Sequence, residues 1–145
     1  MVSNVIFGYL SGATRYKDEF DLIIAAAVRG EIEIAVSTLA EAEVAYLGGE
    51  PENDAEAKIT EFFGRSYVIP IAFDRPVAAA ARTLVREGMR ENRRLKPPDA
   101  IHLATCLVWG IPLLETNDAD LIRWDDIRTG PARSSCCLQG PSPRC

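Results

Sequence analysis

The chain has 145 residues, of which 48% are hydrophobic and 26% charged, and its formal net charge at pH 7 is −5. These values are ordinary for one globular domain whose core needs no disulfide or metal staple. The negative charge argues against a general nucleic-acid binder, and the sequence shows neither a membrane-spanning apolar run nor a signal peptide with a basic start. We therefore expect a cytoplasmic protein without a membrane partner.

The N-terminal region begins directly with a predicted helix. Ser3 or Asn4 is placed to cap a helix that runs to Leu10. A strand normally precedes such a cap in an α/β protein, and the sequence leaves no room for one. Residues 16–29 form the next predicted helix, and Gly30 is its stop.

The next segments alternate between strand and helix patterns. Residues 31–36 alternate and then turn apolar, which predicts a strand. Ser37 is placed to cap a helix over residues 38–46. Asn53 begins a capping-box pattern for a further helix through Phe63.

A basic segment follows the second predicted strand. Residues 67–72 predict that strand, and a proline within it favours a position at the sheet edge. Asp74 then caps a long helix. Residues 75–96 hold seven basic and two acidic residues, a net charge of +5 on an otherwise acidic chain. Three arginines step by four along one helix face, which predicts either contacts to RNA phosphates or a solvated face: Arg82, Arg86 and Arg90.

Residues 96–120 give the strongest pattern in the chain. Two prolines predict the start of a helix with Asp99 in its first turn, where the helix dipole favours a negative charge, and Gly110 is its stop. The apolar spacing places Leu107 and Val108 on the inner face of this helix. Residues 111–114 are apolar and predict a short buried strand. Polar residues follow that strand directly: Thr116, Asn117, Asp118 and Asp120.

The alternation of strands and helices predicts an α/β fold with three layers, α/β/α, around a mostly parallel central sheet. In open sheets of this kind, ligands bind outside the carboxyl ends of the strands. We therefore expect Asp99 and Asp118 to meet at one rim of the sheet. Several acids at one rim suit a divalent cation that activates water for phosphodiester hydrolysis, although helix capping explains Asp99 and Asp118 equally simply.

The sequence resembles the PIN-domain family, particularly the VapC-like ribonuclease toxins of toxin–antitoxin pairs. The resemblance covers roughly residues 2 to 127, so we expect residues 1–127 to form one PIN-like domain. It rests on residues 3–5, Ser37-Thr38, residues 42–44, residues 98–104, and Thr116-Asn117-Asp118 with Asp120.

The resemblance implies an endoribonuclease that uses Mg²⁺ or Mn²⁺ and cleaves RNA. Glu43, Asp99 and Asp118 match the family's catalytic, metal-binding acids. The resemblance also implies a homodimer and a VapB-like antitoxin as partners, for which the apolar helices at residues 5–10 and 20–27 are candidate surfaces or simply core. The residues expected to support the acids are Asn4, Thr116, Asn117 and Asp120.

The sequence departs from the family at its first acid. The family pattern has an aspartate where this chain has Val2, and the first strand that should hold it is largely missing. A late gene start, a fragment or a degenerate copy would each explain this. The alternative function is therefore a catalytically impaired PIN-like domain that binds antitoxin or RNA without cleaving. A plainer alternative is an unrelated α/β domain whose acids are helix caps.

Several residues outside the acid pattern also have an expected role or environment. His102, three residues after Asp99, is expected to make a structural contact, and Trp109 and Trp124 to lie in the core or an interface. Cys106 and three C-terminal cysteines match no metal-ligand spacing, so we expect reduced thiols. Residues 128–145 have no apolar period, and we expect a disordered tail whose native origin is open.

Overall fold

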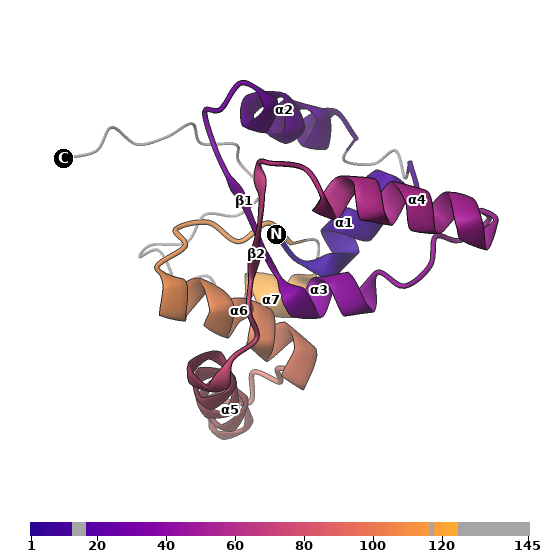
Figure 1. Ribbon diagram of the computed structural model, residues 1–145. Coiled ribbons are helices and arrows are strands. Elements are labelled where there is room, and N and C mark those ends of the chain that lie inside the picture. Colours follow the sequence, from indigo (N-terminus) through magenta and orange to yellow (C-terminus); the bar gives the residue numbers. More distant parts are fainter. Residues whose placement is uncertain (13–16, 117, 125–145) are drawn as a thin grey trace.

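The computed structural model describes residues 1–12, 17–116 and 118–124 (Figure 1). The predicted tail at residues 128–145 lies outside them. The helices are α1 (Ser3–Leu10), α2 (Lys17–Val28), α3 (Thr38–Glu43), α4 (Glu52–Phe63), α5 (Arg75–Arg90), α6 (Pro97–Trp109) and α7 (Ala119–Ile122), and the strands are β1 (Ile34–Ser37) and β2 (Val68–Ile71).

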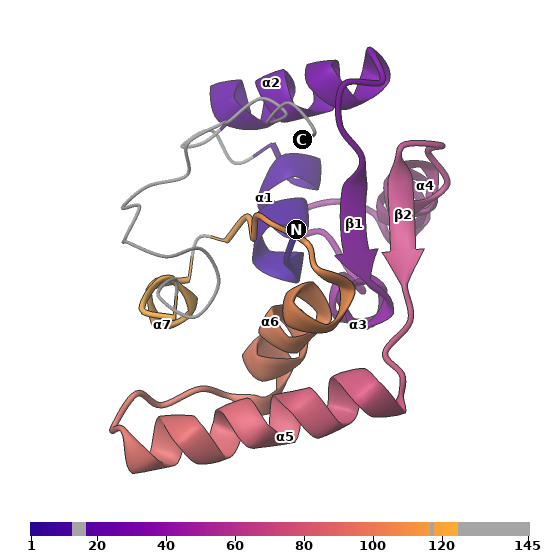
Figure 2. The ribbon, with the colours of Figure 1, turned by 90° about the vertical axis from the view of Figure 1, so that its left-hand side faces the viewer.

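The predicted α/β class and the parallel strand pairing are confirmed. β1 and β2 pair in parallel, with Ile34 opposite Val68 and Ser37 opposite Ile71. Within the described residues this sheet has two strands, so Pro70 of β2 lies at an edge, where its missing N–H does no harm. Figures 1 and 2 show α4 on one face of the strands and α6 beside the carboxyl end of β1.

The predicted strand at residues 111–114 is wrong. The chain has no regular secondary structure there. Pro112 has no N–H to donate to a neighbouring strand. The Val2 N–H donates to the Glu115 carbonyl at 3.2 Å, and the Met1 amino group donates to the Ala35 carbonyl at 3.0 Å. Met1 and Val2 thus lie between β1 and this segment, near the N label in Figure 2.

Local signals predicted some helix ends correctly and others not. The Ser37 hydroxyl accepts from the Leu39 N–H, the Asp74 carboxylate accepts from the Val77 N–H, and Gly110 ends α6 in a left-handed conformation at φ 63°. The caps predicted at the starts of α1 and α4 are wrong, because Val2 and Pro51 hold those positions without a side-chain cap. The helix predicted over residues 38–46 ends at Glu43.

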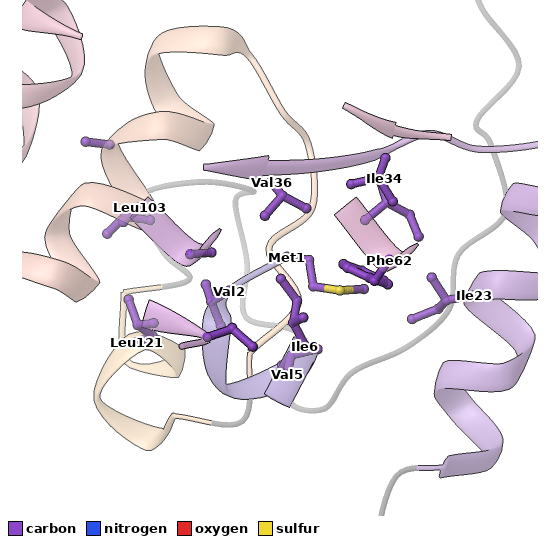
Figure 3. Packing of buried hydrophobic residues seen from close by; sticks show 14 of the residues in the cluster. Met1, Val2, Val5, Ile6, Ile23, Ile34, Val36, Phe62, Leu103 and Leu121 are labelled. Atoms are coloured by element: carbon purple, nitrogen blue, oxygen red, sulfur yellow. The ribbon is translucent and has the colours of Figure 1, made fainter. Parts of the chain in front are cut away.

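The core brings the start of the chain against the sheet and α6. Ile6 is fully buried, and burial of such a side chain contributes about 1.5–3 kcal/mol to stability. Leu107 and Val108 are 39% and 43% exposed, so their predicted inner placement is wrong. Trp124 is buried and Trp109 is exposed. No helix in the described part of the chain is long and apolar enough to cross a membrane. Figure 3 shows the cluster with Met1, Val2, Val5, Ile6, Ile23, Ile34, Val36, Phe62, Leu103 and Leu121 labelled.

Candidate acidic site

Asp99 lies in the first turn of α6, as the sequence predicted. Pro97 and Pro98 begin the helix with backbone already suited to its first turn. The Asp99 side chain is half-buried, and no hydrogen bond or ion pair joins its carboxylate to another described residue. A partly buried carboxylate without a partner is costly, because burial removes water that would otherwise stabilise its charge.

Glu43 reaches the same region from α3. It is the last residue of that short helix, which the Ser37 cap starts directly after β1. Its Oε2 lies 2.9 Å from Nε2 of His102, one turn after Asp99 on α6. Burial lowers the pKa of His102 below its ordinary value, against the hydrogen bond and charge of Glu43, which raise it. The imidazole is therefore neutral at pH 7, and its Nε2–H donates to the carboxylate.

Asp118 approaches from the segment after α6. Its Oδ1 accepts from the Asp120 N–H at 2.7 Å, so Asp118 caps α7, and its own N–H donates to the Thr116 hydroxyl at 3.0 Å. Thr116 is buried and so supports the backbone at Asp118. Asp120 pairs with Arg123 at 3.4 Å within α7. Asn117 lies outside the described residues.

The charges of the three acids act on one another. The pKa of Asp99 is raised above its ordinary value, first by burial and then by the negative charge of Asp118; Glu43 adds to this, while Lys96 and His102 oppose it. Asp118 and Glu43 thus lie near enough to Asp99 for their charges to act on it. The sequence predicted a structural contact for His102 but did not identify Glu43 as its partner, because no local signal links residues that are 59 positions apart.

The donor set suits a divalent cation by chemistry and charge. Carboxylate oxygens are the ligands that Mg²⁺ and Mn²⁺ prefer, and a cation would relieve the repulsion at Asp99. Across residues 1–12, 17–116 and 118–124, however, no group of three or more His, Cys, Asp or Glu side chains is close enough to hold a metal ion. Binding would therefore require the carboxylates to move closer together.

Two positions near the start of the chain differ from these acids because neither carries a charge. Asn4 is exposed on the first turn of α1, and Val2 is 2% exposed in the core. The position at which the sequence resemblance expects an acid is thus held by a buried apolar side chain.

The arginine row lies on α5, which packs against α6 and crosses below it in Figure 2. The three side chains are exposed, and within the described part of the chain none of them pairs with a carboxylate: Arg82, Arg86 and Arg90. A row of exposed cations without carboxylate partners is suited to phosphate contacts and equally to a solvated face.

Comparison with known proteins identifies the fold family. The family model for the PIN domain matches residues 2–127. No curated protein and no solved structure matches the chain. Since the matched region takes in both strands and every described helix, the chain belongs to the PIN domain family.

Proposed function

We propose that this protein is a metal-dependent endoribonuclease, the VapC-like toxin of a toxin–antitoxin pair. PIN domains are in general metal-dependent nucleases that bind RNA. The observation that carries the proposal is the half-buried Asp99 carboxylate, which has no hydrogen-bond or ion-pair partner among the described residues and whose pKa the charges of Asp118 and Glu43 raise. Such a group costs stability unless a cation compensates it.

Glu43, Asp99 and Asp118 are the residues that would hold Mg²⁺ or Mn²⁺. Each flanking acid has one oxygen engaged within the protein, Glu43 with His102 and Asp118 with the Asp120 N–H, which leaves the other oxygen for a ligand. When bound, such a cation supplies a hydroxide-like water at neutral pH and stabilises charge on the scissile phosphate. The Thr116 hydroxyl supports the backbone at Asp118, and the family resemblance gives Asn117 a supporting role for the same acid.

The proposed substrate is RNA, held in part by the arginines of α5. Their exposure and the absence of carboxylate partners among the described residues support phosphate contacts that do not read sequence. The proposed partners are a second copy of the chain and a VapB-like antitoxin. The buried faces of α1 and α2 serve the core, so the exposed apolar end of α6 is the better candidate surface: Leu107, Val108 and Trp109.

One observation favours a second candidate, a PIN domain that binds RNA or antitoxin without cleaving. Val2 is buried where the family pattern has an acid, so this chain offers three carboxylates instead of four. We therefore expect at most slow cleavage.

The test is RNA cleavage by the purified chain, with labelled single-stranded and structured RNA, in Mg²⁺, in Mn²⁺ and in EDTA. The proposal predicts slow cleavage that needs the metal and is lost in Asp99→Asn. Cleavage that survives EDTA or Asp99→Asn contradicts it. RNA binding and Mn²⁺ binding without cleavage favour the second candidate instead.

A further inference from the structure

Basic side chains without a carboxylate partner are confined to one segment of the described chain. Some basic residues there each pair with a carboxylate: Lys17, Arg29, Lys58, Arg65, Arg93 and Arg123. The others are exposed, have no such partner among the described residues, and all lie within residues 75–96: Arg75, Arg82, Arg86, Arg90, Arg94 and Lys96. We call this second set the basic track. An ordinary solvated surface mixes the two signs of charge, so this segregation suits a polyanionic ligand.

Four members of the basic track lie in a row on α5. The helix buries Val77 and Leu84 on the side that packs against α6, and the arginines lie on the opposite side. Arg75 precedes Arg82 by seven positions, close to two helical turns, and the next two arginines follow at steps of four. The row is therefore about 22 Å long and is carried by a rigid, packed helix.

The other two members lead from α5 towards Asp99. Arg94 and Lys96 lie in the connection between α5 and α6, and Lys96 directly precedes the first residue of α6. Lys96 and Asp99 are three positions apart, so at most about 11 Å of chain separates them. The basic track thus begins on α5 and ends beside the predicted site acid.

The composition of this segment favours a base-paired ligand over a single strand. Residues 75–96 contain no aromatic side chain. Proteins that bind single strands without reading sequence combine cations with aromatic side chains on which the bases stack. Double-stranded RNA is instead contacted largely through its phosphates and 2′-hydroxyls. A rigid duplex also loses less conformational entropy than a single strand when it meets a row of cations on a rigid helix.

We infer that the basic track binds the phosphate backbone of a base-paired RNA segment, so the RNA that this protein takes is structured RNA with a stem. The inference rests on the proposed function and deepens it by naming the kind of RNA. It also adds three residues to those proposed to contact RNA: Arg75, Arg94 and Lys96.

The test measures RNA binding in EDTA by fluorescence anisotropy, so it depends on neither metal nor cleavage. The probes are a labelled RNA hairpin with a stem longer than the row on α5 and an unstructured RNA of equal length. The parent protein should bind the hairpin at least about tenfold more tightly at the same salt concentration. Replacing Arg75, Arg94 and Lys96 together with glutamine should weaken hairpin binding about tenfold and lower the magnitude of its salt-dependence slope by about 2–3.

A matched control replaces Arg29, Lys58 and Arg65 with glutamine. The change in net charge is the same, but these cations lie outside the basic track and pair with carboxylates. Hairpin affinity should stay within about twofold of the parent protein, because salt screens distant surface charges.

Equal losses in the two triple variants, or equal affinity of the parent protein for the two RNAs, overturn the inference. Its failure is distinguishable from failure of the proposed function. Hairpin binding that depends on the basic track, without cleavage in Mg²⁺ or Mn²⁺, supports the inference and refutes the nuclease. Metal-dependent cleavage of the hairpin with unchanged binding in the track variant supports the nuclease and refutes the inference.

Discussion

Asp99→Asn should stabilise the metal-free protein. Burial and the charges of Asp118 and Glu43 raise the pKa of Asp99, so its ionised form is less stable in the folded than in the unfolded chain. Partly exposed charge pairs are worth about 0.2–1 kcal/mol each. Asp99→Asn removes the repulsions from Asp118 and Glu43 but also loses the favourable interaction of the charge with the helix dipole, worth about 0.3–1 kcal/mol. The relief is the larger of the two, because the net shift in the pKa of Asp99 is upward.

The expected net gain is about 0.5–1 kcal/mol, or roughly 2–5 °C in Tm. The assay is thermal unfolding in EDTA at pH 7.5. The gain should shrink as the pH falls through the raised pKa of Asp99 and should vanish below the ordinary carboxyl pKa of about 4, where Asp99 is protonated in both states.

Glu41→Gln is a matched control for this prediction. Glu41 also lies in the first turn of a helix, α3, and is exposed. Its replacement loses the helix-dipole term without relieving a buried cluster, so Tm should stay equal or fall slightly. A folded Asp99→Asn protein with a lower Tm than the parent in EDTA would refute the reasoning about the acidic region.

Two further predictions concern packing and RNA binding. Gly88→Ala should lower the free energy of unfolding by about 1–3 kcal/mol, because the new Cβ would lie 2.4 Å from the Arg93 carbonyl oxygen. Gly8→Ala is the control: its Cβ would meet open space, so the substitution should be neutral or stabilising by up to about 1 kcal/mol. Chemical denaturation measures both variants, and equal effects would contradict the packing at Gly88. The three exposed α5 arginines should be replaced together by glutamine: Arg82, Arg86 and Arg90. RNA binding, measured by fluorescence anisotropy, should weaken, and the slope of log affinity against log salt concentration should fall in magnitude by about 2–3. Unchanged affinity at low salt would show that these side chains form only a solvated face.

Local signals predicted most helices, because caps and stops act over a few residues. Ser37, Asp74 and Gly110 each hold the predicted role through a contact or backbone angle within their own turn. The strand predicted at residues 111–114 is wrong because a strand, unlike a helix, needs a partner from elsewhere in the chain. An apolar run becomes a strand only where a neighbouring strand supplies hydrogen bonds, and just after this segment the Glu115 carbonyl accepts instead from the Val2 N–H at the start of α1.

The candidate site was predictable in part. The sequence pattern placed Asp99 and Asp118 at one rim, and the structure brings them close enough for Asp118 to raise the pKa of Asp99. The sequence offers Glu43 as a further acid on an early helix, but only the family resemblance matches it to a metal-binding position, since an acid at a helix end has no distinguishing pattern. Its contact with His102 depends on how α3 meets α6, which no spacing in the sequence reveals.

The most direct test of the central claim is an electron paramagnetic resonance titration of the parent protein and Asp99→Asn with Mn²⁺. The account predicts saturable binding by the parent and at least about tenfold weaker binding by Asp99→Asn, because the half-buried Asp99 carboxylate, whose pKa the charges of Asp118 and Glu43 raise, is the proposed main ligand. Absence of saturable binding by the folded parent, or equal affinity in the two proteins, would contradict the account.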